Sequence, residues 1–165
     1  MQIILIEREP KAMNKIYISD RGKQHKRIND FLKRSRLPYE KRHLEYGDYQ
    51  IEGKPIVIFV FESIQEFAAA VRDKKKDHFW KQVSRATGRD EKELFCLISD
   101  IVDDEQLLSE IKIMEKYPNA HVLFLDERDI APLVFCILNQ WFDSDPCSLL
   151  AAYGKKIRRQ RKNDK

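Results

Sequence analysis

The alternation of apolar and polar positions along the chain predicts a series of short strands and helices. Unbroken apolar runs rich in β-branched and aromatic residues are typical of strands buried on both faces. Apolar residues at helical spacing, with charged residues between them, are typical of amphipathic helices. Buried strands are predicted at residues 2–6, 55–61, 93–101 and 121–125.

Helices are predicted between these strands. Residues 23–36 place Ile28 and Leu32 on one face and basic residues on the remaining surface. Ser63 and Glu66 have the spacing of a capping box, which predicts a helix that runs through residue 71. Further helices are predicted at residues 79–88, 103–117, 129–142 and 147–161.

Two segments in the first third of the chain complete the pattern. Residues 11–22 are mostly polar and are predicted to form a loop. Residues 39–51 alternate in character and are predicted to form one strand, which pairs with residues 55–61 as a hairpin. The turn at residues 52–55 sets Asp48 opposite roughly Phe59.

The order of these elements predicts the fold class. Strands that alternate with helices, with only one hairpin, are typical of an α/β fold. We expect a mixed, mostly parallel central sheet with helices on both faces. Residues 1–143 are predicted to form this domain, and residues 144–165 a C-terminal helix with a basic tail.

Composition narrows the class of protein. A chain of 165 residues, 42% of them hydrophobic, is long enough to bury a single core. No apolar run reaches eighteen residues, so we expect no membrane partner. The N-terminus has no basic segment typical of a secretory signal. Cys96, Cys136 and Cys147 lack metal-ligand spacing, so we expect an intracellular protein of the cytoplasm and nucleoid or of the nucleus.

The charge is unevenly distributed. Residues 155–165 carry seven basic residues and one acidic residue (+6), residues 11–43 carry eleven and three (+8), and residues 93–154 carry three and twelve (−9). Basic segments attract phosphate backbones, although a solvated tail has the same composition. The predicted DNA contacts are Lys23, Lys26, Arg27, Lys33 and Arg34 in the first helix, and Lys155, Lys156, Arg158, Arg159 and Arg161 in the tail.

Acidic residues lie near the ends of three predicted strands. Glu9 follows the first, Asp48 lies in the second and Glu62 ends the third. Acids from neighbouring strands can hold Mg²⁺ or Mn²⁺, which activates water for phosphodiester cleavage. The alternative is structural, because Glu62 also lies near a helix N-terminus, where a negative charge is favoured.

Several segments resemble the nuclease domain of the XPF/Hef excision-repair endonucleases. IILIEREP, LEYGDY and the apolar strand leading into SIQEF are similar to the family patterns I-I-V-D-x-R-E-P, L-x-x-G-D-Y and V-E-R-K-S-x-x-D-L. HFWKQVSRA, ELFCLISD and HVLFLDERDIAPLV resemble the segments that follow, so the resemblance covers about residues 2–142. It implies a restriction-endonuclease-like fold.

The resemblance also implies a degenerate site. Asp48 matches the metal-binding aspartate of G-D-Y, but the metal-binding glutamate falls on Val60 and the lysine on Glu62. The family's first aspartate falls on Ile6. The vestigial or rearranged catalytic residues are therefore Arg8, Asp48, Glu62 and Glu66, and the candidate metal ligands are Asp48 and Glu9.

The resemblance implies a function without strong catalysis. We expect a DNA-binding protein, inactive or weak as a nuclease, that acts as a repair or recombination subunit on branched DNA or single-strand/double-strand junctions. It implies a homodimer or a heterodimer with a related subunit. The strongly apolar segment 129–142 is then either internal or half of a dimer interface.

Two alternatives stay open. The first is an active endonuclease, dependent on Mg²⁺ or Mn²⁺ and specific for DNA structure, with rearranged metal ligands. The second is a protein-interaction module that does not bind DNA.

Overall fold

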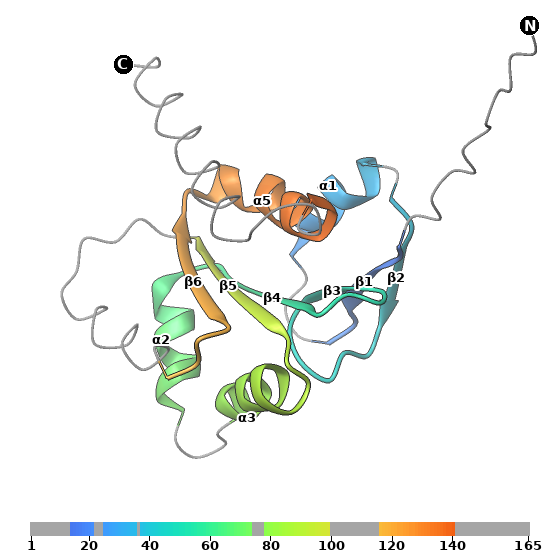
Figure 1. Ribbon diagram of the computed structural model, residues 1–165. Helices are drawn as coiled ribbons and strands as arrows, with labels where there is room; N and C mark the ends of the chain where they lie inside the picture. The colour runs from blue at the N-terminus through green and yellow to red at the C-terminus, as the bar shows by residue number, and fades with distance from the viewer. Residues whose placement is uncertain (1–13, 22–24, 36, 74–77, 100–115, 141–165) are drawn as a thin grey trace, which may run out of the picture.

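The computed structural model describes residues 14–21, 25–35, 37–73, 78–99 and 116–140 (Figure 1). Within these ranges the strands are β1 (Ile16–Ser19), β2 (Tyr39–Arg42), β3 (Tyr49–Ile51), β4 (Ile56–Phe61), β5 (Glu93–Ser99) and β6 (Ala120–Leu125). The helices are α1 (Lys26–Arg34), α2 (Ile64–Arg72), α3 (His78–Ser84) and α5 (Glu127–Gln140), and a π-helical turn (Arg85–Arg89) follows α3.

The described strands form one sheet in the order β2-β1-β3-β4-β5-β6. β1 pairs with β2, β4 with β5 and β5 with β6 in parallel, whereas β3 pairs antiparallel with both β1 and β4. Helices α1 and α5 lie on one face of the sheet, and α2 and α3 lie on the other (Figure 1). The predicted fold class, a mixed and mostly parallel α/β fold, is confirmed.

Two predictions for the first third of the chain are wrong. Residues 11–22 were predicted to be a loop, but Ile16–Ser19 is strand β1, with Ile16 and Ile18 buried beneath α1. Residues 39–51 were predicted to be one strand, but they form β2 and β3 with a bend between them. The bend separates the partners, because β2 pairs with one side of β1 and β3 with the other. The strand predicted at residues 2–6 lies outside the described residues.

The predicted hairpin and capping box are confirmed. β3 and β4 pair antiparallel with Tyr49 opposite Ile58, which continues to Asp48 opposite Phe59. The Ser63 hydroxyl accepts a hydrogen bond from the Glu66 N–H at 3.1 Å. The Glu66 carboxylate accepts one from the Glu62 N–H at 2.9 Å. These bonds satisfy backbone donors before the first full turn of α2.

Two apolar clusters fill the space between the sheet and its helices. Strand β4 is buried at all six positions because both of its faces are covered. One cluster lies under α1 and α5, and the other joins β4 and β5 to α2 and α3. The rings of Phe61, Phe67 and Phe79 meet edge to face in the second cluster. These contacts make β4 and β5 the centre of the core.

The apolar residues of α5 are largely accounted for by this core. Five of them are buried in the cluster under α1 and α5, namely Ile130, Leu133, Val134, Ile137 and Leu138. The half-buried Phe135 packs edge to face against Phe31 of α1, with ring centroids 5.8 Å apart. The sequence left open whether this helix is internal or half of a dimer interface, and the residues named above are internal. Trp141 and Phe142 lie outside the described residues. None of the described helices has the length and hydrophobicity needed to cross a bilayer.

Candidate functional site

The carboxyl ends of the parallel strands β4, β5 and β6 lie side by side, close to the first turns of α1 and α5. In α/β sheets, ligands commonly bind at the carboxyl ends of the strands. A cavity of about 740 Å³ opens here. The polar residues that line it are His25, Lys26 and Arg27 near the start of α1, Glu62 after β4, Ser99 at the end of β5, and Asp126 and Glu127 at the start of α5.

A smaller cavity of about 290 Å³ lies on the other side of His25 and Val60, since these two residues line both cavities. Besides His25, its polar lining consists of Asp48 in the hairpin, Glu66 in α2, Asp73 directly after α2, and His78 and Gln82 in α3. The structure therefore places Asp48 and Glu66 at one cavity and Glu62 at the other, on either side of the end of β4.

A glycine sets the position of Asp48. Gly47 has φ +77°, and a Cβ atom there would lie 2.5 Å from Cγ1 of Val57. Only glycine tolerates both the left-handed conformation and this close approach to β4. The Asp48 N–H then donates to the Ile58 carbonyl at 2.8 Å.

The Asp48 carboxylate is held by two different groups. Its Oδ2 accepts a hydrogen bond from the Val60 N–H at 2.8 Å. Its Oδ1 lies 3.7 Å from Nε2 of His25. One oxygen is thus fixed by the backbone of β4, and the other faces a buried imidazole.

Val60 stands next to Asp48, where the family resemblance implies a second acid. It contributes a buried apolar side chain to the walls of both cavities. Glu66 is bound to the backbone at the start of α2. Among the described residues, no group of three His, Cys, Asp or Glu side chains is arranged to hold a metal ion. The Mg²⁺ or Mn²⁺ site remains a prediction, since Glu9 lies outside those residues.

His25 was not identified as a site residue from the sequence. It is the N-cap residue of α1, and its side chain is only 7% exposed. Its ring is tilted against Tyr49, with centroids 6.2 Å apart. A histidine directly before a predicted helix is a signal that could have indicated it, but its approach to Asp48 depends on the tertiary fold.

The bend that carries Asp48 is fastened to the turn after α3. The Tyr46 hydroxyl donates to Asp90 at 2.6 Å, and Arg89 bonds both Asp90 and Glu45. Hydrogen bonds from Arg89, and then from Tyr46, hold the pKa of Asp90 at about 2. Burial, and secondly the bond to Asp90, raises the pKa of Tyr46. The Gly47 N–H also donates to Gln82 at 3.2 Å, so α3 and its turn fix the bend.

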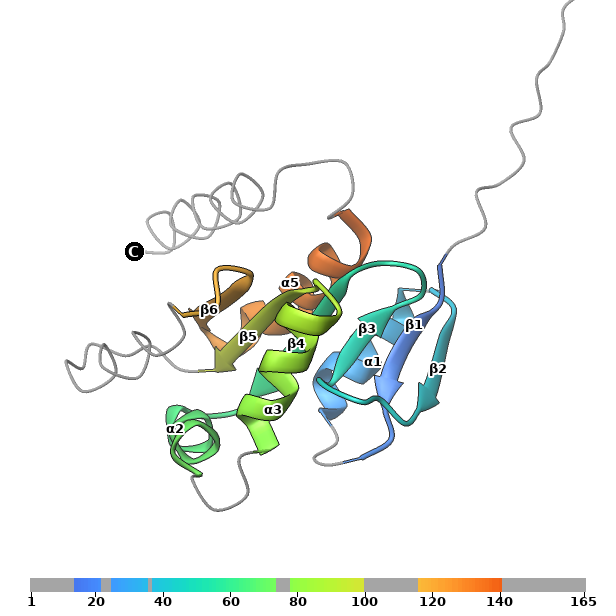
Figure 2. The ribbon, with the colours of Figure 1, turned by 60° about the horizontal axis from the view of Figure 1, so that its bottom comes forward.

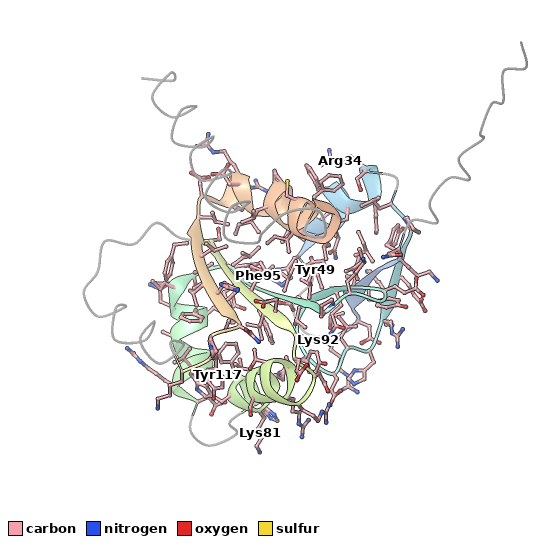
Figure 3. The ribbon with its side chains drawn as sticks, in the orientation of Figure 1. Arg34, Tyr49, Lys81, Lys92, Phe95 and Tyr117 are labelled. Atoms are coloured by element: carbon pink, nitrogen blue, oxygen red, sulfur yellow. The ribbon has the colours of Figure 1, made fainter. Side chains whose placement is uncertain are left out.

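The predicted basic residues of α1 lie on its outer surface. Lys26, Arg27, Lys33 and Arg34 are all exposed, and their spacing places them on one side of the helix. Arg34 points away from the sheet at the top of Figure 3. Arg27 forms an exposed ion pair with Glu127 at 2.9 Å. The other predicted site residues lie outside the described residues, namely Arg8, Glu9, Lys23, Lys155, Lys156, Arg158, Arg159 and Arg161.

The edge strand β2 adds basic residues that were not among the predicted DNA contacts. Strand β2 is exposed at all four positions and contributes Lys41 and Arg42. The Arg42 guanidinium lies 4.4 Å from the centroid of the Tyr17 ring on β1. The described part of residues 14–42 contains eight Lys or Arg residues and three acidic residues, which gives a net charge of +5. Exposed basic residues therefore lie both on α1 and on strand β2.

No protein-family model matches this chain, and a search of curated proteins gives no relative. The resemblance to XPF/Hef nuclease domains therefore rests on the sequence motifs alone.

Proposed function

We propose that this protein binds structured DNA through a nuclease-like domain without cutting it efficiently, as a repair or recombination subunit. It acts inside the cell on branched DNA or on single-strand/double-strand junctions. It works as a homodimer or with a related subunit. The observation that carries the proposal is the apolar Val60 beside Asp48, in the wall of a cavity that Lys26 and Arg27 also line.

The loss of cleavage follows from the chemistry of the metal. Mg²⁺ keeps an octahedral shell and is bound through carboxylates together with ordered waters. Asp48 supplies one carboxylate, and that group is already engaged with the Val60 N–H. Val60 has no oxygen atom with which to complete a pair. A metal held this weakly would leave the phosphodiester without an activated water.

The binding of DNA follows from the exposed basic residues of α1 and β2. These Lys and Arg side chains can neutralise phosphates and release condensed counterions. Such contacts position a duplex without reading its sequence. A protein of this kind would recognise DNA by shape and charge, which suits branched structures.

The experiment is a combined binding and cleavage assay on labelled fork and flap DNA. Incubation with Mg²⁺ or Mn²⁺ is expected to leave the DNA intact, while a gel shift at low salt shows a complex. Asp48→Ala is expected to leave binding within about twofold, because Asp48 is not among the basic residues of α1 and β2. Absence of a complex at low salt would contradict the proposal and support a protein-interaction module.

An active endonuclease is the second candidate, and one observation favours it. Asp48, Glu66 and Asp73 line the same small cavity, together with His25 and His78. A rearrangement of these side chains would be needed to form a ligand set. Metal-dependent cleavage that disappears in Asp48→Ala would establish this candidate in place of the first.

A further inference from the structure

The strands β1, β2 and β3 form a part of the sheet in which one face is open. Ile16 and Ile18 of β1 are buried in the cluster under α1, so the alternation of the strand places Tyr17 on the opposite face. Of the described helices on that side, α3 lies across β4, and none covers β1 or β2 (Figure 2). Tyr17 is therefore only half-buried, although its strand has neighbours on both sides.

Tyr17 lies in a row of side chains that crosses the three strands. The Arg42 guanidinium of β2 lies 4.4 Å from the centroid of the Tyr17 ring, within the range of a cation–π contact. On the other side of Tyr17, the pairing of β1 with β3 places Gln50. The Gln50 Nε2 donates to the Tyr46 carbonyl at 2.8 Å, and its side chain also carries an acceptor oxygen. A ring, a planar cation and an amide thus line the open face.

The charges of the open face are divided along β1. Where the strand begins, Lys15 is paired with Glu40 at 3.4 Å, and its N–H donates to Glu52 at 3.3 Å. At the other end, the charged residues of β1, β2 and the turn between them are exposed, namely Asp20, Arg21 and Arg42. Within the described residues, no ion pair joins Arg42 to an acid. The uncompensated positive charge at this end favours a phosphate.

We propose that the open face of β1, β2 and β3 binds a single strand of DNA. A base stacks on the platform that the Tyr17 ring and the Arg42 guanidinium form, and the N–H groups of the guanidinium bind an adjacent phosphate. Sheet faces with exposed aromatic side chains bind single-stranded nucleic acid in this way. The bases of a duplex stack on one another, so the ligand of this platform is an unpaired strand.

This inference rests on the proposed function and adds a second surface to it. The basic residues of α1 lie on the opposite side of the sheet from Tyr17, and the two sides meet at β2. There, Lys33 of α1 lies 5.6 Å from the centroid of the Tyr39 ring on one side, while Arg42 contacts Tyr17 on the other. A junction that passes around β2 would place its duplex on α1 and its single-stranded arm on the open face.

The test is fluorescence anisotropy of the full chain at low salt, with a labelled oligothymidylate and with a duplex of the same length. Tyr17→Ser is expected to weaken binding of the single strand about tenfold and to leave binding of the duplex within about twofold. Tyr17→Phe keeps the ring and is expected to bind like the wild type. Tyr39→Ser is the matched control, because it removes an exposed ring from the α1 side of β2.

Arg42→Gln is a second variant, and its exposed position on β2 keeps the test independent of the folding of Tyr17→Ser. It is expected to weaken binding of the single strand and to make the slope of log affinity against log salt shallower by about 0.7. Unchanged affinity and slope in Arg42→Gln would overturn the inference, as would unchanged affinity in a folded Tyr17→Ser. So would a loss in Tyr17→Phe equal to that in Tyr17→Ser, because the hydroxyl and not the ring would then make the contact.

The same measurements separate this inference from the proposed function. Binding of the duplex without binding of the oligothymidylate would overturn the inference and leave the DNA-binding proposal intact. Absence of binding to the single strand, the duplex and a fork would overturn both, because the proposed function itself would have failed.

Discussion

The outer half of the sheet, β2-β1-β3 with α1, differs from the inner half, β4-β5-β6 with α2, α3 and α5. Strand β2 is exposed throughout and its neighbourhood is basic, whereas β4 is buried throughout. In Figure 2 the face of β1, β2 and β3 turned to the viewer carries no described helix, while α3 lies across β4. We therefore expect the inner half to supply most of the stability, whereas the outer half leaves charged side chains and strand backbone exposed.

The largest expected effect is on the inner half. Phe67→Ala removes a fully buried ring that contacts Phe61 and Phe79. Urea denaturation should show a loss of about 3–5 kcal/mol of unfolding free energy. The matched substitution in the outer half, Tyr39→Ala, removes a ring that is 43% exposed. If both substitutions cost the same, the two halves do not divide stability in this way.

Gly47→Ala should come next. The added Cβ would lie 2.5 Å from Val57 at a φ of +77°, so we expect a loss of about 2–4 kcal/mol in the same denaturation experiment. Gly53→Ala is its control, because φ is also positive there but no atom lies within 4 Å of the added Cβ. A cost for Gly47→Ala no larger than that for Gly53→Ala would mean that the bend is not pressed against β4.

The inner half was the more predictable from sequence, for a physical reason. Strands such as β4 and β5 are covered on both faces, so they appear in the sequence as runs of consecutive apolar residues. The start of α2 is fixed by local hydrogen bonds of Ser63 and Glu66, which their spacing in the sequence indicates. β1 and β2 have four residues each and lie among polar neighbours. β1 is stabilised by the packing of Ile16 and Ile18 under α1, and the exposed β2 is held by its pairing with β1, and no local pattern records either of these contacts.

The residues of the candidate site likewise differ in how far the sequence alone could identify them. Asp48 was identified because it follows a glycine in a short motif, and the exposed basic residues of α1 were identified from helical spacing. The contact of His25 with Asp48 joins positions 23 residues apart, from α1 and the hairpin. Only the tertiary fold brings them together, so the sequence could not reveal it.

Introducing an acid beside Asp48 should create metal binding. Val60→Glu is expected to lower stability in EDTA by about 1–3 kcal/mol, because a carboxylate replaces a buried apolar group. Mn²⁺ at about a hundred times its dissociation constant should restore about 2.7 kcal/mol. Thermal melts with and without Mn²⁺ measure this, with Val60→Gln as the control. An equal Mn²⁺ shift in the wild type would show that the native site already binds metal.

The smallest expected effect is acid sensitivity at the bend. The pKa of Asp90 in the folded state is about 2, below its ordinary value of 3.8, so its contribution to stability is present above about pH 4 and is lost as the pH falls towards 2. Asp90→Asn should flatten the fall in melting temperature over that range. An identical fall in both proteins would assign the acid sensitivity to other carboxyl groups.

The salt dependence of DNA binding tests the central claim, that the outer half binds phosphates, most directly. Fluorescence anisotropy with fork DNA would compare the wild type with a variant in which Lys26, Arg27, Lys33 and Arg34 are all replaced by Gln. We expect the slope of log affinity against log salt to become shallower by up to about 4 in the variant, with an unchanged denaturation midpoint. Equal slopes and affinities for the two proteins would contradict the account.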